Sequence, residues 1–110
     1  SLSGPGVDAY SVDIKVNNDT IQKLLNAKLL DPATNVIMPS SMFTIPSSLE
    51  VAKGKRSGFF TLSIDYAMLK SVAYRNKFLL VSIGFSNAKT YELNAALSSA
   101  IVVVDVNKIP

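Results

Sequence analysis

The sequence predicts a mainly β fold, an immunoglobulin-like antiparallel β-sandwich of about seven strands with one short helix. Three observations support this. Apolar and polar residues alternate along 10–16 and 49–65, residues 78–85 and 100–106 are almost wholly apolar, and turn-forming residues separate these segments. Alternation indicates a strand with one packed and one solvated face, whereas an apolar run indicates a central strand. Six or seven strands with a single helix favour a sandwich over an α/β fold.

The length and composition indicate one packed domain. The chain has 110 residues, of which 48% are hydrophobic, and a net charge of +3. A chain of this size buries a core without metals or disulfides. We assign residues 1–9 to a linker or to the edge of an expressed fragment, and residues 10–110 to a single β-sandwich domain. The absence of cysteine favours the cytosol or a bacterial envelope.

The strict alternation over residues 10–16 predicts the first strand. The apolar spacing then becomes helical, which predicts a short helix with Asp19 or Thr20 as its N-cap and a stop at Asp31-Pro32. The apolar stripe of this helix is Ile21, Leu24, Leu25 and Leu29.

Prolines flank the short apolar segments 36–38 and 42–45, which predicts strands at an edge or between sheets. Residues 49–65 predict a hairpin with a basic, two-glycine tip. Residues 66–75 predict a helical turn, and residues 86–99 a long connection. The side chains that we expect in the core are Phe60, Leu62, Ile64, Leu80, Ile101 and Val103.

The residue types present exclude most catalytic chemistry. Histidine and cysteine are absent, so the commonest general base, the thiol nucleophile and the usual zinc ligands are missing. Asp13, Asp65 and Asp105 fall on the polar phase of predicted strands. We therefore predict no enzymatic activity, no catalytic residue, no cofactor and no metal site. Basic residues outnumber acidic ones only slightly and are scattered along the chain, which argues against nucleic-acid binding.

Three weaker candidates have a simpler structural explanation. Residues 53–58 are an anion-binding loop or, preferably, a charged hairpin tip, because no helix follows them. Tyr66, Tyr74 and Tyr91 are weak candidates for stacking against a glycan, with core or rim positions preferred. Asn18-Asp19-Thr20 is an N-glycosylation sequon, although a turn that caps the helix explains the same residues.

Several short motifs follow one another in order: Leu24-Leu25-Asn26, Met38-Pro39, the strand of Phe43, Leu49-Glu50-Val51-Ala52-Lys53-Gly54, residues 74–83 and Ile101-Val102-Val103-Val104. Together they resemble the N-terminal domain of unknown function 1735 found in surface lipoproteins of gut Bacteroidetes. The resemblance covers about the whole domain. Phe43 stands where the family usually has tyrosine, and residues 78–83 lack its proline.

This resemblance implies a non-catalytic accessory domain of an outer-membrane lipoprotein associated with polysaccharide capture. The domain would act as a spacer or as a glycan-presenting or glycan-binding module. Its partners would be a polysaccharide or a neighbouring carbohydrate-binding module. The domain would face the cell exterior and would be attached to the membrane only through a lipid anchor upstream of this chain. Asp19-Thr20-Ile21 is similar to the O-glycosylation acceptor pattern of these bacteria, which makes Thr20 a candidate. The alternative is an adhesion or protein–protein interaction domain that pairs through sheet edges.

Overall fold

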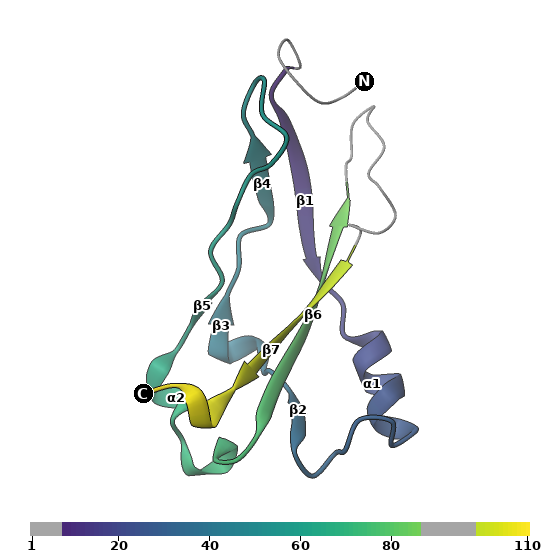
Figure 1. The fold of residues 1–110 in the computed structure, drawn as a ribbon, viewed down its shortest axis with the longest axis vertical. Coiled ribbons are helices and arrows are strands. Elements are labelled where there is room, and N and C mark those ends of the chain that lie inside the picture. Colours follow the sequence, from purple (N-terminus) through teal and green to yellow (C-terminus); the bar gives the residue numbers. More distant parts are fainter. Residues whose placement is uncertain (1–7, 87–98) are drawn as a thin grey trace.

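The computed structural model describes residues 8–86 and 99–110 and confirms the mainly β prediction, with seven strands in two sheets (Figure 1). The larger sheet contains β1 (Tyr10–Val16), β2 (Asn35–Ile37), β4 (Ser48–Val51), β6 (Phe78–Ser86) and β7 (Ser99–Asp105). The smaller sheet pairs β3 (Phe43–Thr44) with β5 (Ser63–Ile64). The helices are α1 (Asp19–Asn26) and the short α2 (Tyr66–Leu69), with 3₁₀ turns η1 (Ser40–Met42), η2 (Val72–Tyr74) and η4 (Val106–Lys108).

Strand β6 is the centre of the larger sheet. It pairs along most of its length with β7, while β2 and β1 share its other side. The β2–β6 pair is parallel, whereas the other pairs are antiparallel as predicted. The parallel pair arises because α1 and the turn after it reverse the chain between β1 and β2.

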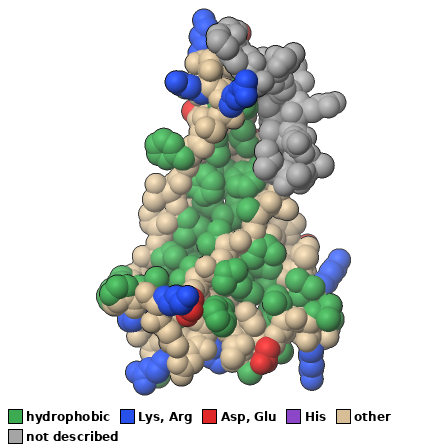
Figure 2. All heavy atoms as spheres, in the orientation of Figure 1, with side chains coloured by type: hydrophobic (Ala, Val, Ile, Leu, Met, Phe, Trp, Pro, Cys, Tyr) green, Lys and Arg blue, Asp and Glu red, His purple; other side chains and the backbone are tan. Residues whose placement is uncertain are grey.

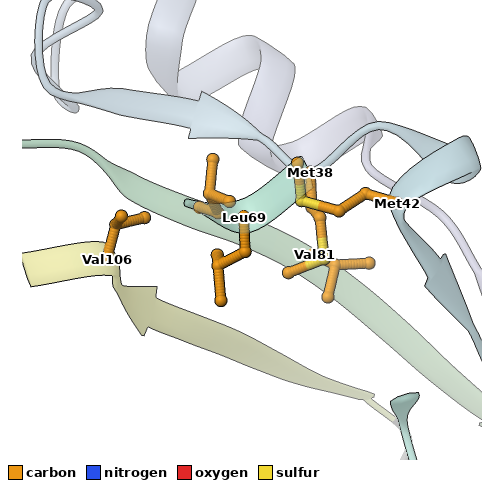
Figure 3. Close-up of a cluster of buried hydrophobic side chains, with 6 residues drawn as sticks. Met38, Met42, Leu69, Val81 and Val106 are labelled. Atoms are coloured by element: carbon orange, nitrogen blue, oxygen red, sulfur yellow. The ribbon is translucent and has the colours of Figure 1, made fainter. Parts of the chain in front are cut away.

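The core lies between β6 and the smaller sheet, which gives the fold its sandwich-like arrangement. Met38, Met42, Leu69, Val81 and Val106 point toward one another there (Figure 3), together with Leu79. Phe43, Ile64, Val102 and Val104 pack against this cluster from β3, β5 and β7. Each packing residue of β6 is odd-numbered, as alternation along a strand requires.

The helix predicted after β1 is present, but its ends differ from the prediction. Its N-cap is Asn18, so Asp19 and Thr20 are already helical. The helix ends at Asn26, and Lys28 has a positive φ of 59°. Leu29 therefore leaves the apolar stripe and is 75% exposed, while Ile21 is fully buried.

The predicted hairpin over residues 49–65 is wrong in its pairing. Strand β4 pairs with β1, and β5 pairs with β3, so the two arms belong to different sheets. The arms approach closely at Gly58, where a Cβ would lie 2.4 Å from the backbone oxygen of Glu50. Beyond Gly58 the second arm turns away, and residues 59–62 form no strand. The extended path of this arm toward β5 is visible in Figure 1.

The predicted core is correct for Leu80, which is 3% exposed, whereas Ile101 and Val103 are exposed by 49% and 57%. Their neighbours Val102 and Val104 face the core instead. The sequence could not show which alternate residues of β7 face the core, because both faces of the strand are apolar. Of the predicted core residues that precede β6, Phe60, Leu62 and Ile64 are half-buried.

Candidate functional site

Three acidic side chains, those of Asp31, Asp65 and Asp105, accept hydrogen bonds from nearby backbone nitrogens. The Asp65 carboxylate accepts a hydrogen bond from the backbone nitrogen of Met68 at 3.0 Å and caps α2. The Asp105 carboxylate accepts one from the backbone nitrogen of Asn107 at 3.2 Å and caps η4. Within residues 8–86 and 99–110, no cluster of three acidic side chains is close enough to hold a metal ion.

The three candidate tyrosines lie in different settings. Tyr66 is 58% exposed, and its hydroxyl donates a hydrogen bond to the carbonyl oxygen of Pro110. Lys70 reinforces this attachment, since its Nζ donates to the carbonyl oxygen of Ile109 at 2.7 Å. Tyr74 is half-buried and packs against the core cluster. Tyr91 lies outside the described residues. Tyr66 thus holds the C-terminal residues, while Tyr74 contributes to packing.

Thr20 is exposed at the second position of α1. The two residues that order this helix start are Asn17 and Asn18. The Asn17 side chain accepts a hydrogen bond from the backbone nitrogen of Asp19 at 3.0 Å, and that of Asn18 accepts one from the backbone nitrogen of Ser82 at 2.9 Å. The turn expected at Asn18 is therefore formed by Asn17, and Asn18 joins the helix to β6.

A shallow hollow of about 510 Å³ lies beside this helix start. Its walls come from the end of β1, the first residues of α1 and the end of β6, namely Lys15, Val16, Asn17, Asn18, Asp19, Gly84, Phe85 and Ser86. The register places Lys15 opposite Gly84, so both lie on one face of the sheet, and alternation directs the Phe85 side chain to the other face. The hollow therefore has a mixed polar and apolar lining, and the Phe85 ring is engaged by Phe60 on the other face of the sheet.

The end of the molecule formed by residues 51–60 carries a different set of groups. Lys53, Lys55 and Arg56 are exposed on a turn closed by a hydrogen bond from the Lys55 nitrogen to the Ala52 oxygen, 2.9 Å, with Gly54 at a φ of 76°. Basic side chains gather at this end of the molecule in Figure 2. We call residues 53–56 the basic tip. The segment is therefore a charged turn as predicted, but it is not the tip of a hairpin, since the strands on its two sides belong to different sheets.

Two aromatic residues, Phe59 and Phe60, lie shortly after the basic tip in the sequence. Phe59 is 91% exposed, which is rare for so large an apolar side chain. The ring of Phe60 meets that of Phe85 with centroids 5.9 Å apart and planes tilted by 55°. Phe60 thereby fixes the backbone that presents Phe59. The sequence signal for Phe59 was a large apolar residue in the polar phase of the alternating segment, close to a cluster of cations.

Comparison with known proteins supports the fold. No family model and no curated protein sequence matches the chain. A solved structure of a "putative carbohydrate binding protein" from Bacteroides ovatus is similar, with a TM-score of 0.58 and 14% identity. The likeness covers 92% of this chain and 28% of the other, so this chain spans less than a third of that protein. At this identity the likeness shows the fold, and the resemblance to domain of unknown function 1735 stays a prediction.

Proposed function

We propose that this chain is a non-catalytic accessory domain of a bacterial outer-membrane surface lipoprotein that takes part in polysaccharide capture. The observation that supports this best is the likeness of nearly the whole fold to part of a Bacteroides protein named for carbohydrate binding. The sequence motifs point to the same class of bacterial surface proteins. The carboxylates of Asp65 and Asp105, two of the acids weighed as catalytic candidates, are instead used to cap α2 and η4.

Phe59 and the basic tip are the surface that we assign to glycan contact. An exposed aromatic ring provides an apolar platform, and sugar rings present apolar C–H faces to such platforms. Lys53, Lys55 and Arg56 would bind acidic groups on the same polymer through charge-assisted hydrogen bonds. The ligand class is therefore a polysaccharide with carboxylate or sulfate groups. The hollow beside α1 is the weaker candidate, because its one aromatic residue, Phe85, has its ring against Phe60.

A glycan array with the 110-residue chain tests this assignment. We expect retention on acidic polysaccharides, loss of retention in Phe59→Ala, and weaker retention with rising salt because the cations are solvent-exposed. Val72→Ala is the matched control, since Val72 is also an exposed apolar residue (72%) but belongs to η2. Equal retention of the Phe59 and Val72 variants would refute the assignment of the surface. Absence of glycan retention by the parent chain would refute glycan binding itself.

The location at the cell surface has its own test. No helix within residues 8–86 and 99–110 is long and apolar enough to cross a membrane. A lipid anchor on a cysteine upstream would supply the attachment instead. Labelling the natural host with a palmitate analogue should mark the natural protein, and external protease should digest it on intact cells. An unlabelled protein that is protected from protease would contradict the surface-lipoprotein proposal.

A further inference from the structure

Strand β7 is an open edge of the larger sheet. Among the described strands it pairs only with β6. The backbone carbonyl groups of Leu80 and Ser82 point toward β1 and β2, away from β7. The Leu80 oxygen accepts a hydrogen bond from the Met38 nitrogen, and the Ser82 oxygen accepts one from the Asn17 nitrogen. Their partners across the ladder are Val103 and Ile101. In an antiparallel pair these are the non-hydrogen-bonded positions, so the backbone N–H and C=O groups of Ile101 and Val103 point outward.

The exposed face of this edge is apolar. Ile101 and Val103 are 49% and 57% exposed, and no charged residue occurs within residues 99–104. Hydrophobic side chains lie exposed along β7 in Figure 2. Natural edge strands are commonly protected by lysine, proline, a bulge or shortness, because unprotected edges pair with other chains. β7 has seven residues and neither lysine nor proline. The edge therefore has the features of a pairing surface.

We propose that β7 pairs with β7 of a second copy of this chain, antiparallel about a two-fold axis. The strand that fits this edge must supply outward backbone groups, apolar side chains on one face and no charge opposite Ile101 or Val103. Strand β7 itself meets all three requirements, so the contact is self-complementary, as a two-fold interface must be. Association through sheet edges is the alternative function that the sequence predicts, and this pairing names the strand and the partner.

Among the registers that bring the outward backbone groups together, the one centred on Val102 fits the side chains best, since a register centred on Ile101 would place Val103 opposite Ser99. With Val102 on the axis, Ile101 lies opposite Val103 of the second copy, and Ser99 lies opposite its Asp105. The outward backbone groups of Ile101 and Val103 then hydrogen-bond across the axis. With Val103 on the axis, each Ile101 would instead face the Asp105 carboxylate. The register centred on Val102 keeps apolar residues together and pairs each acid with a hydroxyl.

Sedimentation velocity over a concentration series of the 110-residue chain tests the pairing. We expect a monomer–dimer equilibrium that Val103→Lys weakens at least tenfold, because the ammonium would face an apolar partner. Val72→Lys is the control, since Val72 is exposed but lies away from β7. A chain that stays monomeric at all concentrations would overturn the proposal. So would a dimer that Val103→Lys leaves unchanged while the variant keeps the thermal stability of the parent.

Two further variants test the register. Ser99→Lys should strengthen dimerisation in a salt-dependent way and Ser99→Asp should weaken it, because residue 99 faces Asp105 of the second copy. The chain has no cysteine, so Val102→Cys introduces a single thiol that lies opposite itself across the axis. We expect mild oxidation to yield a disulfide-linked dimer. Equal affinities for both Ser99 variants, together with no cross-link in Val102→Cys, would overturn the β7–β7 register.

Discussion

The two ends of this elongated molecule differ in whether their side chains are buried or exposed (Figure 1). The end near α2 and η4 buries Met42, Leu69, Leu79 and Val106 in one cluster and ties down the C-terminal residues through Tyr66 and Lys70. The opposite end exposes the basic tip and Phe59 on a turn that joins the two sheets. The comparison teaches that the exposed side chains of the basic tip and Phe59, unlike those of the buried cluster, can be replaced with little effect on folding.

The largest expected effect lies in the buried cluster. Leu79 is fully buried at the centre of β6. Leu79→Ala should lower the free energy of unfolding by about 2–5 kcal/mol, since the lost apolar contacts and the remaining cavity both cost stability. Urea unfolding followed by circular dichroism measures this. A midpoint unchanged from that of the parent would contradict the assignment of the core.

The next effect concerns the link between α1 and the sheet. Asn18→Ala removes the acceptor of the Ser82 backbone nitrogen, and Ser82 is itself 9% exposed. An unsatisfied buried N–H costs about 1–3 kcal/mol, so we expect a loss in that range. Asn17→Ala is the matched control, because the donor that it leaves, the Asp19 nitrogen, is exposed to water. Equal losses in unfolding free energy for the two variants would show that Asn18 is no special link.

At the opposite end, replacing Lys53, Lys55 and Arg56 with glutamine should change the free energy of unfolding by less than about 0.5 kcal/mol. All three side chains are exposed and remote from the buried cluster. Retention on acidic glycans should fall in the same variant, which separates binding from stability. A large loss of stability would erase the contrast between the two ends.

The sequence predicted the fold class, β1 from its alternation, α1 from its helical spacing and β6 from its apolar run, because these are local patterns. It failed where the answer depends on pairing between distant segments. The alternation of residues 49–65 predicts β4 and the short β5 but cannot reveal that β4 pairs with β1 and β5 with β3. Likewise, a strand that is apolar on both faces, as β7 is, gives no phase, so Ile101 and Val103 were placed inward.

The candidate surfaces were less predictable for the same reason. The basic tip is a local pattern and was recognised as a charged turn. The role that we propose for Phe59 depends on the contact of Phe60 with Phe85, 25 positions away in the sequence, which no local pattern encodes. Tyr66 was singled out for its ring, whereas the structure shows its hydroxyl holding Pro110.

The smallest expected effect on folding concerns Thr20, which we propose as an O-glycosylation site on the strength of the Asp19-Thr20-Ile21 motif. Thr20 is exposed, while Ile21 beside it is fully buried, so a glycan on the Thr20 hydroxyl would extend away from the helix face that packs on β6. Asn18, and not Thr20, is the N-cap, which leaves the hydroxyl without a capping role to lose. Thr20→Ala should therefore leave the free energy of unfolding within about 0.5 kcal/mol of the parent.

Intact-mass measurement on protein from the natural host should show a sugar increment that disappears in Thr20→Ala and persists in the control Thr61→Ala, where an exposed threonine lacks the motif. A natural protein whose mass equals the bare polypeptide plus its lipid would contradict this proposal, because no sugar would then be attached to Thr20.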